Sequence, residues 1–487
     1  MNTTRDNATA NSQANPPTGS PDRSSRGTNY LFTGIHLLLL GLVALPPVSV
    51  AAFSPAGDIG APWNVLLWLL SAGLLAGGAA GFAIGWMTVQ RRRAVLAGTI
   101  LLIAFYGLAV VLFDTVLGAV VSLNVSGQTG APKADIYGWA IEPNHEITIV
   151  HPDTLEATVE RVNSQGWRDV EHEREKTRPR VLLLGDSQVF GHGNTLENTI
   201  GRQLQHQLGE AIEVISMGNG GYGTDQEYLV LKNEGLDWHP DYVVLVFTVG
   251  NDFMDSMHDI SFMGTAPKPS FELRDGVLVQ RPFEPLKTTW LRTFFNRSNI
   301  SRVVRAMLQA RTVRENPQGL RVPGGHEGDR VQIVAENLNE LDDFENDYSG
   351  YAILKPREQW SPKLEAGWEV TTALLRAMNE ACREAGAVFI LYPNQQLPED
   401  YVYEFVSKGK TYALEAQGPF RMLAEFAAEE GIPFIEEPEE MKQRMAKGEL
   451  SFENDGHYNE VGTKAAAEQI AIKIKQLMHP QGEEPSE

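Results

Sequence analysis

Residues 180–187 read RVLLLGDS, and this short stretch decides the fold. An unbroken apolar run from Val181 to Leu184 ends at Gly185, and Asp186 and Ser187 follow at once. Such a run is typical of a strand that is buried on both faces of a parallel sheet. We therefore expect a central strand whose carboxyl end presents the hydroxyl of Ser187.

Strands and helices alternate on both sides of this stretch. The expected strands are residues 180–184, 212–217, 242–248, 388–391 and 432–435. The expected helices are residues 195–208, 224–234, 364–385, 414–430 and 460–478. Strands joined by helices of this length form a parallel sheet with helices on both faces. The sequence thus predicts an α/β domain over residues 180–478, with a tail at 479–487. It also predicts an insertion at about 254–360, a place where a cap or lid commonly forms.

The first 122 residues differ in composition from the rest. Residues 1–28 are rich in Asn, Thr, Ser and Pro and cannot bury enough surface to order, so they predict a disordered tail. Three long apolar stretches follow, at about 30–53, 63–89 and 94–113. Each is long enough to cross a bilayer core of about 30 Å. We expect a three-helix transmembrane anchor in the lipid bilayer over residues 29–122, and then a linker and lead-in segment at 123–179.

The positive charges predict how this anchor is oriented. Arg91, Arg92 and Arg93 lie between the second and third apolar stretches, whereas residues 54–62, between the first two, contain no Lys or Arg. Loops rich in Lys and Arg stay on the cytoplasmic side. We expect a multi-pass membrane protein with a cytoplasmic N-terminus and its α/β domain outside the cytoplasm.

Charge and cysteine content exclude several classes of function. A formal net charge of −21 argues against nucleic acid as a partner, because phosphate binding needs clustered Lys and Arg. The only cysteine, Cys382, cannot form an intramolecular disulfide, and it is expected to be a small buried apolar residue. The histidines show no metal-binding spacing. We therefore expect no metal and no cofactor.

Four loops carry the residues that could take part in catalysis. They are Gly185-Asp186-Ser187, Gly218-Asn219-Gly220-Gly221-Tyr222-Gly223, Gly250-Asn251-Asp252 and Asp455-Gly456-His457. The first three follow predicted strands and the fourth precedes the last helix. Ligands of an open parallel sheet bind beyond the carboxyl ends of its strands, so these loops should share one rim.

That set supplies what acyl transfer requires. A serine hydroxyl needs a base, and the base needs a carboxylate to fix its tautomer. We expect Ser187 to be the nucleophile, His457 the base and Asp455 the orienting acid. The oxyanion of the tetrahedral intermediate needs preorganised donors. The expected donors are the backbone amides of Ser187 and Gly218 and the side-chain amide of Asn251.

The four pieces, in this order, resemble the four sequence blocks of the SGNH (GDSL) hydrolase superfamily. The resemblance covers about residues 180–260 and 365–475, and it implies a flavodoxin-like sheet and esterase, lipase or O-acyltransferase chemistry. One departure concerns the acid, which the family commonly places three residues before the histidine, where this chain has Asn454. Membrane-associated members that modify polysaccharides often show the closer spacing of Asp455. Glu453 is the alternative acid.

Other interpretations of these residues carry less weight. Gly218, Gly220 and Gly223 match the dinucleotide-binding fingerprint, but their strand is not the first of the sheet, and the next strand does not end in the required acid. His192, five residues after Ser187, is an alternative base, although a contact with substrate or solvent suits its loop better. Asp186 is expected to satisfy backbone donors in its turn rather than to transfer protons.

The sequence therefore predicts a membrane-anchored serine ester hydrolase that works through an acyl-serine intermediate. Its expected partner is an acyl-ester substrate, namely O-acyl groups of an envelope or exported polysaccharide. An O-acyltransferase in a polysaccharide-modifying complex remains open, because its chemistry is the same until the acceptor arrives. A non-catalytic binding module on an SGNH scaffold is the third possibility.

Overall fold

The structure is a computed structural model of the whole chain. It describes residues 133–260, 267–284, 330–334, 344–345, 347, 350–407, 410–453 and 455–479, with a few isolated positions before residue 113. The chain divides into two compact units, Met1–Val120 and Val121–Glu487, and the second contains every element discussed below. The expected N-terminal tail, the three expected membrane spans and much of the expected insertion lie outside the described residues. Among the residues that are described, no helix combines the length and apolar character needed to cross a bilayer.

A four-stranded parallel sheet forms the centre of the second unit. Its strands are β3 (Arg180–Gly185), β4 (Glu213–Gly218), β5 (Tyr242–Phe247) and β9 (Val388–Pro393). The spatial order is β4-β3-β5-β9, and the register pairs Gly185 of β3 with Gly218 of β4 and with Val246 of β5. Beyond β9, Phe434 forms a single parallel bridge with Leu391. This is the flavodoxin-like order, with the first strand in chain order lying inside the sheet.

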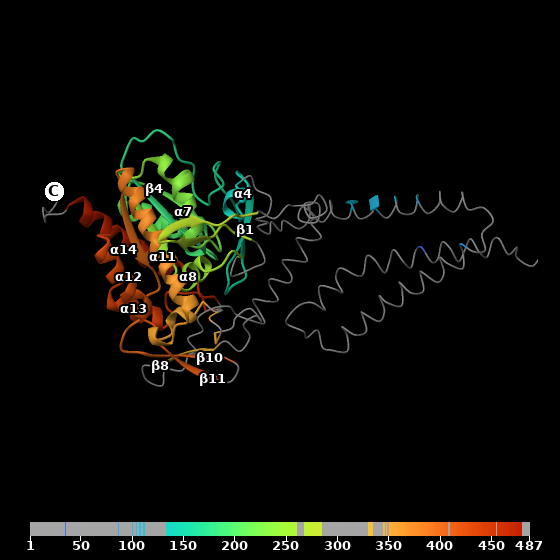
Figure 1. Cartoon of the computed structure of the whole chain (residues 1–487). Coiled ribbons are helices and arrows are strands. Elements are labelled where there is room, and N and C mark those ends of the chain that lie inside the picture. The colour runs from blue at the N-terminus through green and yellow to red at the C-terminus, as the bar shows by residue number, and fades with distance from the viewer. Residues whose placement is uncertain are drawn as a thin grey trace, which may run out of the picture. The chain divides into compact units, whose positions relative to one another are not determined.

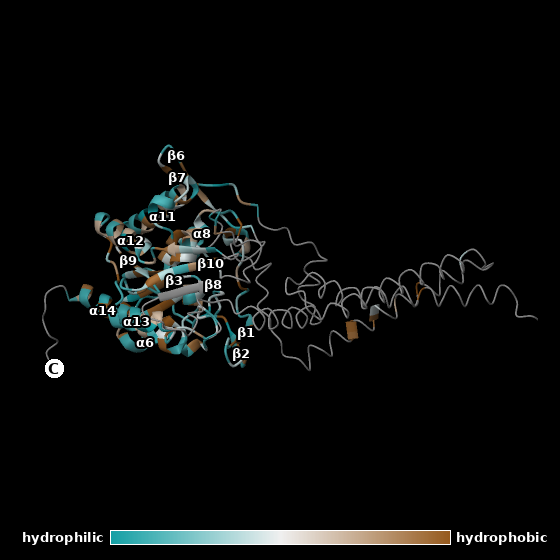
Figure 2. Cartoon of the chain, turned by 90° about the horizontal axis from the view of Figure 1, so that it is seen from below, coloured by the Kyte–Doolittle hydropathy of each residue, from teal (hydrophilic) through white to brown (hydrophobic). Residues whose placement is uncertain are grey.

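Helices cover both faces of this sheet (Figure 1). One face packs on α7 (Thr224–Val230), α11 (Pro362–Glu384) and α12 (Gly418–Glu429). The other packs on α6 (Ile200–Leu208), α13 (Glu439–Ala446) and α14 (Glu460–Met478). Leu182 faces the first layer and Val181 faces the second, as alternation along a strand requires. Figure 2 shows hydrophilic colour on the outer helices and hydrophobic colour toward the sheet. The expected α/β domain with a parallel sheet is therefore confirmed.

Smaller strands lie around this core. A second sheet has the order β11-β10-β8, formed by Lys410–Leu414, Val402–Ser407 and Arg330–Val334, in which β8 runs parallel to β10. Two antiparallel hairpins are β1–β2 (Glu146–Val150 and Ala157–Arg161) and β6–β7 (Phe271–Arg274 and Val277–Gln280). Figure 1 shows β8, β10 and β11 side by side. The described parts of the expected insertion thus contribute strands to these smaller sheets.

Short helices complete the second unit. The α-helices are α4 (Ala134–Tyr137), α5 (Ser187–Phe190) and α8 (Val249–Ser256). The 3-10 helices span Leu196–Asn198, Leu236–Trp238, Ala352–Leu354 and Arg357–Gln359, and a π-helical turn spans Leu231–Gly235.

Three expected elements differ from those observed. The helix expected at 195–208 is α-helical only from Ile200, because the Thr199 side chain caps it by accepting from the amide of Arg202. The helix expected from residue 414 begins at Gly418, because Lys410–Leu414 pairs with β10 instead. The strand expected at 432–435 is reduced to one bridge, since Pro433 has no N–H to donate to a ladder.

Candidate active site

Ser187 is the first residue of α5, directly beyond the carboxyl end of β3. The Asp186 side chain caps this helix by accepting a hydrogen bond from the amide of Gln188 at 2.8 Å. The helix ends after one turn at Gly191, whose φ of +77° favours glycine. The turn thus holds Ser187 at the rim of the sheet.

Two glycines allow α5 to pack across the strand ends. A Cβ on Gly218 would lie 2.6 Å from the Cβ of Val189, and one on Gly185 would lie 2.5 Å from Cγ2 of the same valine. Neither glycine has a positive φ. The need for Gly185 therefore comes from close packing against Val189 and not from a left-handed backbone conformation.

His457 meets Ser187 from the loop that precedes α14. Its Nε2 lies 2.7 Å from the hydroxyl oxygen of Ser187, although the two residues are 270 positions apart in the sequence. Its Nδ1 forms a hydrogen bond with a carboxylate oxygen of Asp455. The same oxygen accepts the backbone N–H of His457 at 2.9 Å. Serine, histidine and aspartate thus form one continuous hydrogen-bonded chain.

Within this hydrogen-bonded triad, Asp455 stabilises the charged form of His457. Burial lowers the pKa of His457, but the hydrogen bond and charge of Asp455 outweigh burial and raise it above 6.5. Burial raises the pKa of Asp455, but the hydrogen bond and charge of His457 hold it below its usual range. An imidazolium that forms during proton transfer is therefore stabilised where it forms.

The buried carboxyl group of Glu437 stabilises the loop that carries His457. Glu437 accepts hydrogen bonds from the hydroxyls of Tyr392 at 2.6 Å and Tyr458 at 2.9 Å. Burial raises the pKa of Glu437 to about 7, although these hydroxyls lower it. Tyr458 follows His457 directly, and Gln395 donates from Nε2 to the carbonyl of Gly456 at 2.6 Å. These residues fix the backbone that carries the base, and no pattern in the sequence indicated their role.

Asn251 reaches the same rim from α8. Its Nδ2 donates a hydrogen bond to Oδ2 of Asp186 at 3.1 Å. The expected oxyanion donors Ser187 and Gly218 lie at the ends of β3 and β4, which pair with each other. The structure therefore brings the predicted donors to neighbouring positions around Asp186.

Buried acidic side chains lie behind Asp186. Burial raises the pKa of both Glu227 and Asp252 well above the usual range, and the charge of Asp186 raises them further. Burial also raises the pKa of Asp186 itself. The base that contacts Ser187 is His457.

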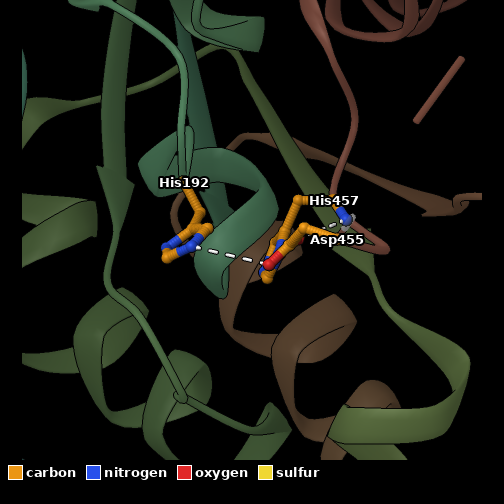
Figure 3. Close-up of side chains that lie close together, drawn as sticks. All are labelled: His192, Asp455 and His457. Atoms are coloured by element: carbon orange, nitrogen blue, oxygen red, sulfur yellow. Dashed lines mark hydrogen bonds and ion pairs between the residues drawn. The ribbon is translucent and has the colours of Figure 1, made fainter. Parts of the chain in front are cut away.

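His192 stands next to the candidate base but does not replace it. Its Nε2 lies 3.8 Å from Oδ2 of Asp455, and its ring centroid lies 4.4 Å from that of His457 (Figure 3). The hydrogen bond to Ser187 comes from His457. His192 is therefore a neighbour of the acid and the base.

The alternative residues occupy other environments. The side chain of Glu453 is exposed, while Asp455 holds the ring of His457. The glycine turn after β4 packs on the lead-in segment, where Trp139 donates from Nε1 to the carbonyl of Gly220 at 3.0 Å. Cys382, on α11, is buried in the core, and burial raises its pKa to about 12.

Arg168, in the lead-in segment, organises the loop after α5. Its guanidinium donates to the carbonyls of Phe190, Gly191 and Asn194 at 2.6–2.7 Å. It also pairs with Glu160 of β2 at 2.6 Å, and its side chain is only 1% exposed. Arg168 belongs to the Gly-Trp-Arg-Asp stretch at residues 166–169. The lead-in segment thus clamps the loop that carries His192.

No protein-family model matches the sequence, and no curated protein matches it. Several solved structures match about 60% of the chain. TesA is 13% identical with a TM-score of 0.31, and the match covers 61% of this chain and 99% of TesA. The psychrotrophic esterase EstA of Pseudoalteromonas sp. is 10% identical with a TM-score of 0.31, and the match covers 61% of this chain and 98% of EstA. The acetyl xylan esterase AlAXEase is 12% identical with a TM-score of 0.29, and the match covers 60% of this chain and 97% of AlAXEase. At TM-scores this low the likeness carries no argument about function, which rests on the site itself.

Proposed function

We propose that the protein is a serine ester hydrolase with Ser187 as nucleophile, His457 as base and Asp455 as orienting acid. The observation that carries the proposal is the continuous hydrogen-bonded chain from the Ser187 hydroxyl through His457 to Asp455. Hydroxyl, imidazole and carboxylate in this geometry form a nucleophile with its base and the orienter of that base.

The chemistry follows in two halves. His457 Nε2 takes the proton of Ser187 while the serine oxygen attacks the ester carbonyl, and the negative charge collects on the carbonyl oxygen. Asn251 and the amides of Ser187 and Gly218 bind that oxyanion. His457 then gives its proton to the leaving alcohol. Water then loses a proton to the same nitrogen and attacks the acyl-serine. His457 returns that proton to the Ser187 oxygen as the bond to the acyl group breaks, which releases the carboxylic acid and regenerates the enzyme.

Covalent labelling tests the nucleophile directly. A fluorophosphonate should modify the purified full-length protein at Ser187, identified by mass spectrometry of the modified peptide. Ser187→Ala should remove the label, and Ser164→Ala, at an exposed serine that bonds to Glu171, should keep it. Absence of any label on a folded wild-type protein would leave a binding module as the better account.

The proposal extends to location and substrate. The apolar stretches before residue 123 anchor the protein in the membrane, with the hydrolase outside the cytoplasm, because the arginines at 91–93 then stay inside. O-acylated envelope or exported polysaccharides are the substrates within reach there. A reporter fused after residue 125 should be active only if it functions outside the cytoplasm. Free acid released from an O-acetylated polysaccharide supports hydrolysis, whereas acetyl transfer to an added sugar would favour an O-acyltransferase.

A further inference from the structure

Three side chains that can bind a metal ion converge beside Ser187. One donor atom from each of His192, Asp455 and His457 lies within 4.8 Å of the other two. Nε2 of His192 lies 3.8 Å from Oδ2 of Asp455. Figure 3 shows the three side chains pointing toward one another. The loop after α5 and the loop before α14 thus supply a shared set of donors.

His192 has no role in the proposed ester hydrolysis. Its ring makes no hydrogen bond within the described part of the chain, apart from its longer contact with Asp455. Gly191 and Gly193, with φ of +77° and +76°, hold the loop in a backbone conformation that favours glycine on both sides of it. The side chain is 48% exposed, so an ion can reach it from solvent and the ring can turn toward the ion.

The donor types select the class of metal. Two imidazoles and one carboxylate suit zinc and its neighbours copper and nickel, whereas magnesium and calcium prefer oxygen ligands alone. Three protein ligands leave a fourth position for water. Donors around a tetrahedral zinc ion lie about 3.4 Å apart, given bonds of about 2.1 Å. A separation of 3.8 Å between His192 and Asp455 therefore needs only a small side-chain adjustment.

We infer that His192, Asp455 and His457 form a site for a zinc-type divalent ion, and that the bound ion switches the enzyme off. The second half rests on the proposed ester hydrolase function. A neutral imidazole has a single lone pair for a metal or a proton. If the metal takes Nε2 of His457, that nitrogen is blocked. If it takes Nδ1, the proton moves to Nε2, which then cannot accept the proton of Ser187. Either mode stops the base.

Binding is measured first, without reference to catalysis. The probe is Zn²⁺ or Co²⁺ added to full-length, tag-free protein stripped with a chelator, followed by calorimetry and by the visible spectrum of Co²⁺. One site is expected in the wild type. His192→Ala should weaken it by at least the roughly 10–100-fold that loss of a supporting partner causes. The matched control is His206→Ala, which removes an exposed histidine 3.6 Å from the carboxylate of Glu197. Among the described residues His206 belongs to no group of three possible metal ligands, so this variant should bind as wild type does.

Inhibition is measured next on an aryl acetate. Zn²⁺ should lower turnover of the wild type and of His206→Ala with the same midpoint as binding, and a chelator should restore it. In His192→Ala the ratio of turnover with and without Zn²⁺ should change only at concentrations at least about tenfold higher. Zn²⁺ should also slow fluorophosphonate labelling of Ser187 with the same dependence on His192.

The outcomes separate the two proposals. Equal Zn²⁺ binding by wild type and His192→Ala would overturn the metal site. Zn²⁺ that binds through His192 but raises turnover would overturn the switch in favour of a metal-bound water. If His192-dependent binding is found while metal-free protein is neither labelled nor active, the site stands and the ester hydrolase function fails.

Discussion

The side chain of Asn251 donates a hydrogen bond from Nδ2 to Oδ2 of Asp186, at 3.1 Å. Asp186 also caps the turn that begins with Ser187. The Asp186 carboxyl group therefore links the Asn251 amide to the backbone amide of Gln188, in the helical turn that begins with Ser187. We expect the second N–H of the same amide group to donate to the oxyanion.

Replacing Asn251 with Ala should lower kcat by about 10²–10³-fold, the usual effect of removing one oxyanion donor. KM should change little, because the oxyanion exists only after the attack of Ser187. Turnover of an aryl acetate gives both constants, and thermal melting checks the fold. Normal kcat in a folded variant would remove Asn251 from the oxyanion site.

The acid of the triad can be tested by comparing two carboxylates. Asp455→Asn should reduce kcat by about 10⁴-fold, because the amide favours the wrong tautomer of His457. Glu453→Gln, at an exposed side chain two positions away, should leave kcat unchanged. The same aryl acetate assay serves both variants. The opposite pattern would assign the role to Glu453 and require a different loop conformation.

The core of the fold followed from local pattern alone. Unbroken apolar runs predicted β3, β5 and β9, and the last helix was expected over the residues that form α14. The pairing of β8 with β10 was missed because the two strands lie far apart in the sequence, so no short window contains both. The hairpin of β10 and β11 is local, but it was missed because its residues were expected to precede or begin a helix. Pro433 indicates against a regular strand at 432–435, because proline cannot donate to a strand ladder.

The site was predictable in its parts but not in its supports. The four loops could be placed at one rim because topology fixes where parallel strands end. Buried charged residues such as Arg168 and Glu437 look like surface residues in a sequence, and only the fold shows their partners. The approach of His192 to Asp455 likewise depends on two loops whose conformations the sequence does not give.

The role of Arg168 predicts a large loss of stability on substitution. Arg168→Gln breaks a buried pair with Glu160 and leaves three backbone carbonyls without their donor. Removing one partner of a buried pair costs about 3–5 kcal/mol. Chemical denaturation followed by tryptophan fluorescence measures the change.

The control for this variant lies on the hairpin that carries Glu160, the partner of Arg168. Arg161 pairs with Glu146, but both side chains are at least half exposed. Arg161→Gln should therefore change stability little, because water screens such pairs. Equal losses of stability in the two variants would show that Arg168 does not stabilise the loop after α5.

The pH dependence of kcat/KM should report His457. The base works only when neutral, and Asp455 raises its pKa above 6.5. Activity should therefore fall as pH decreases through a midpoint above 6.5, and it should be full at higher pH. In Asp455→Asn the residual activity should persist to lower pH, because burial then dominates and lowers the pKa. A wild-type midpoint below 6.5 would contradict this account of the pair.

The contact between Ser187 and His457 predicts how their losses combine. Each residue depends on the other, since the hydroxyl is a weak nucleophile without the base and the base has nothing to deprotonate without the hydroxyl. Ser187→Ala and His457→Ala should each lower kcat by on the order of 10⁴–10⁶-fold, and the double variant should be little worse than either. Independent roles would instead multiply the two losses. The measurement is aryl acetate turnover by full-length protein, with circular dichroism to confirm folding. Multiplied losses would separate the two residues, and near-normal activity of Ser187→Ala would end the acyl-serine mechanism.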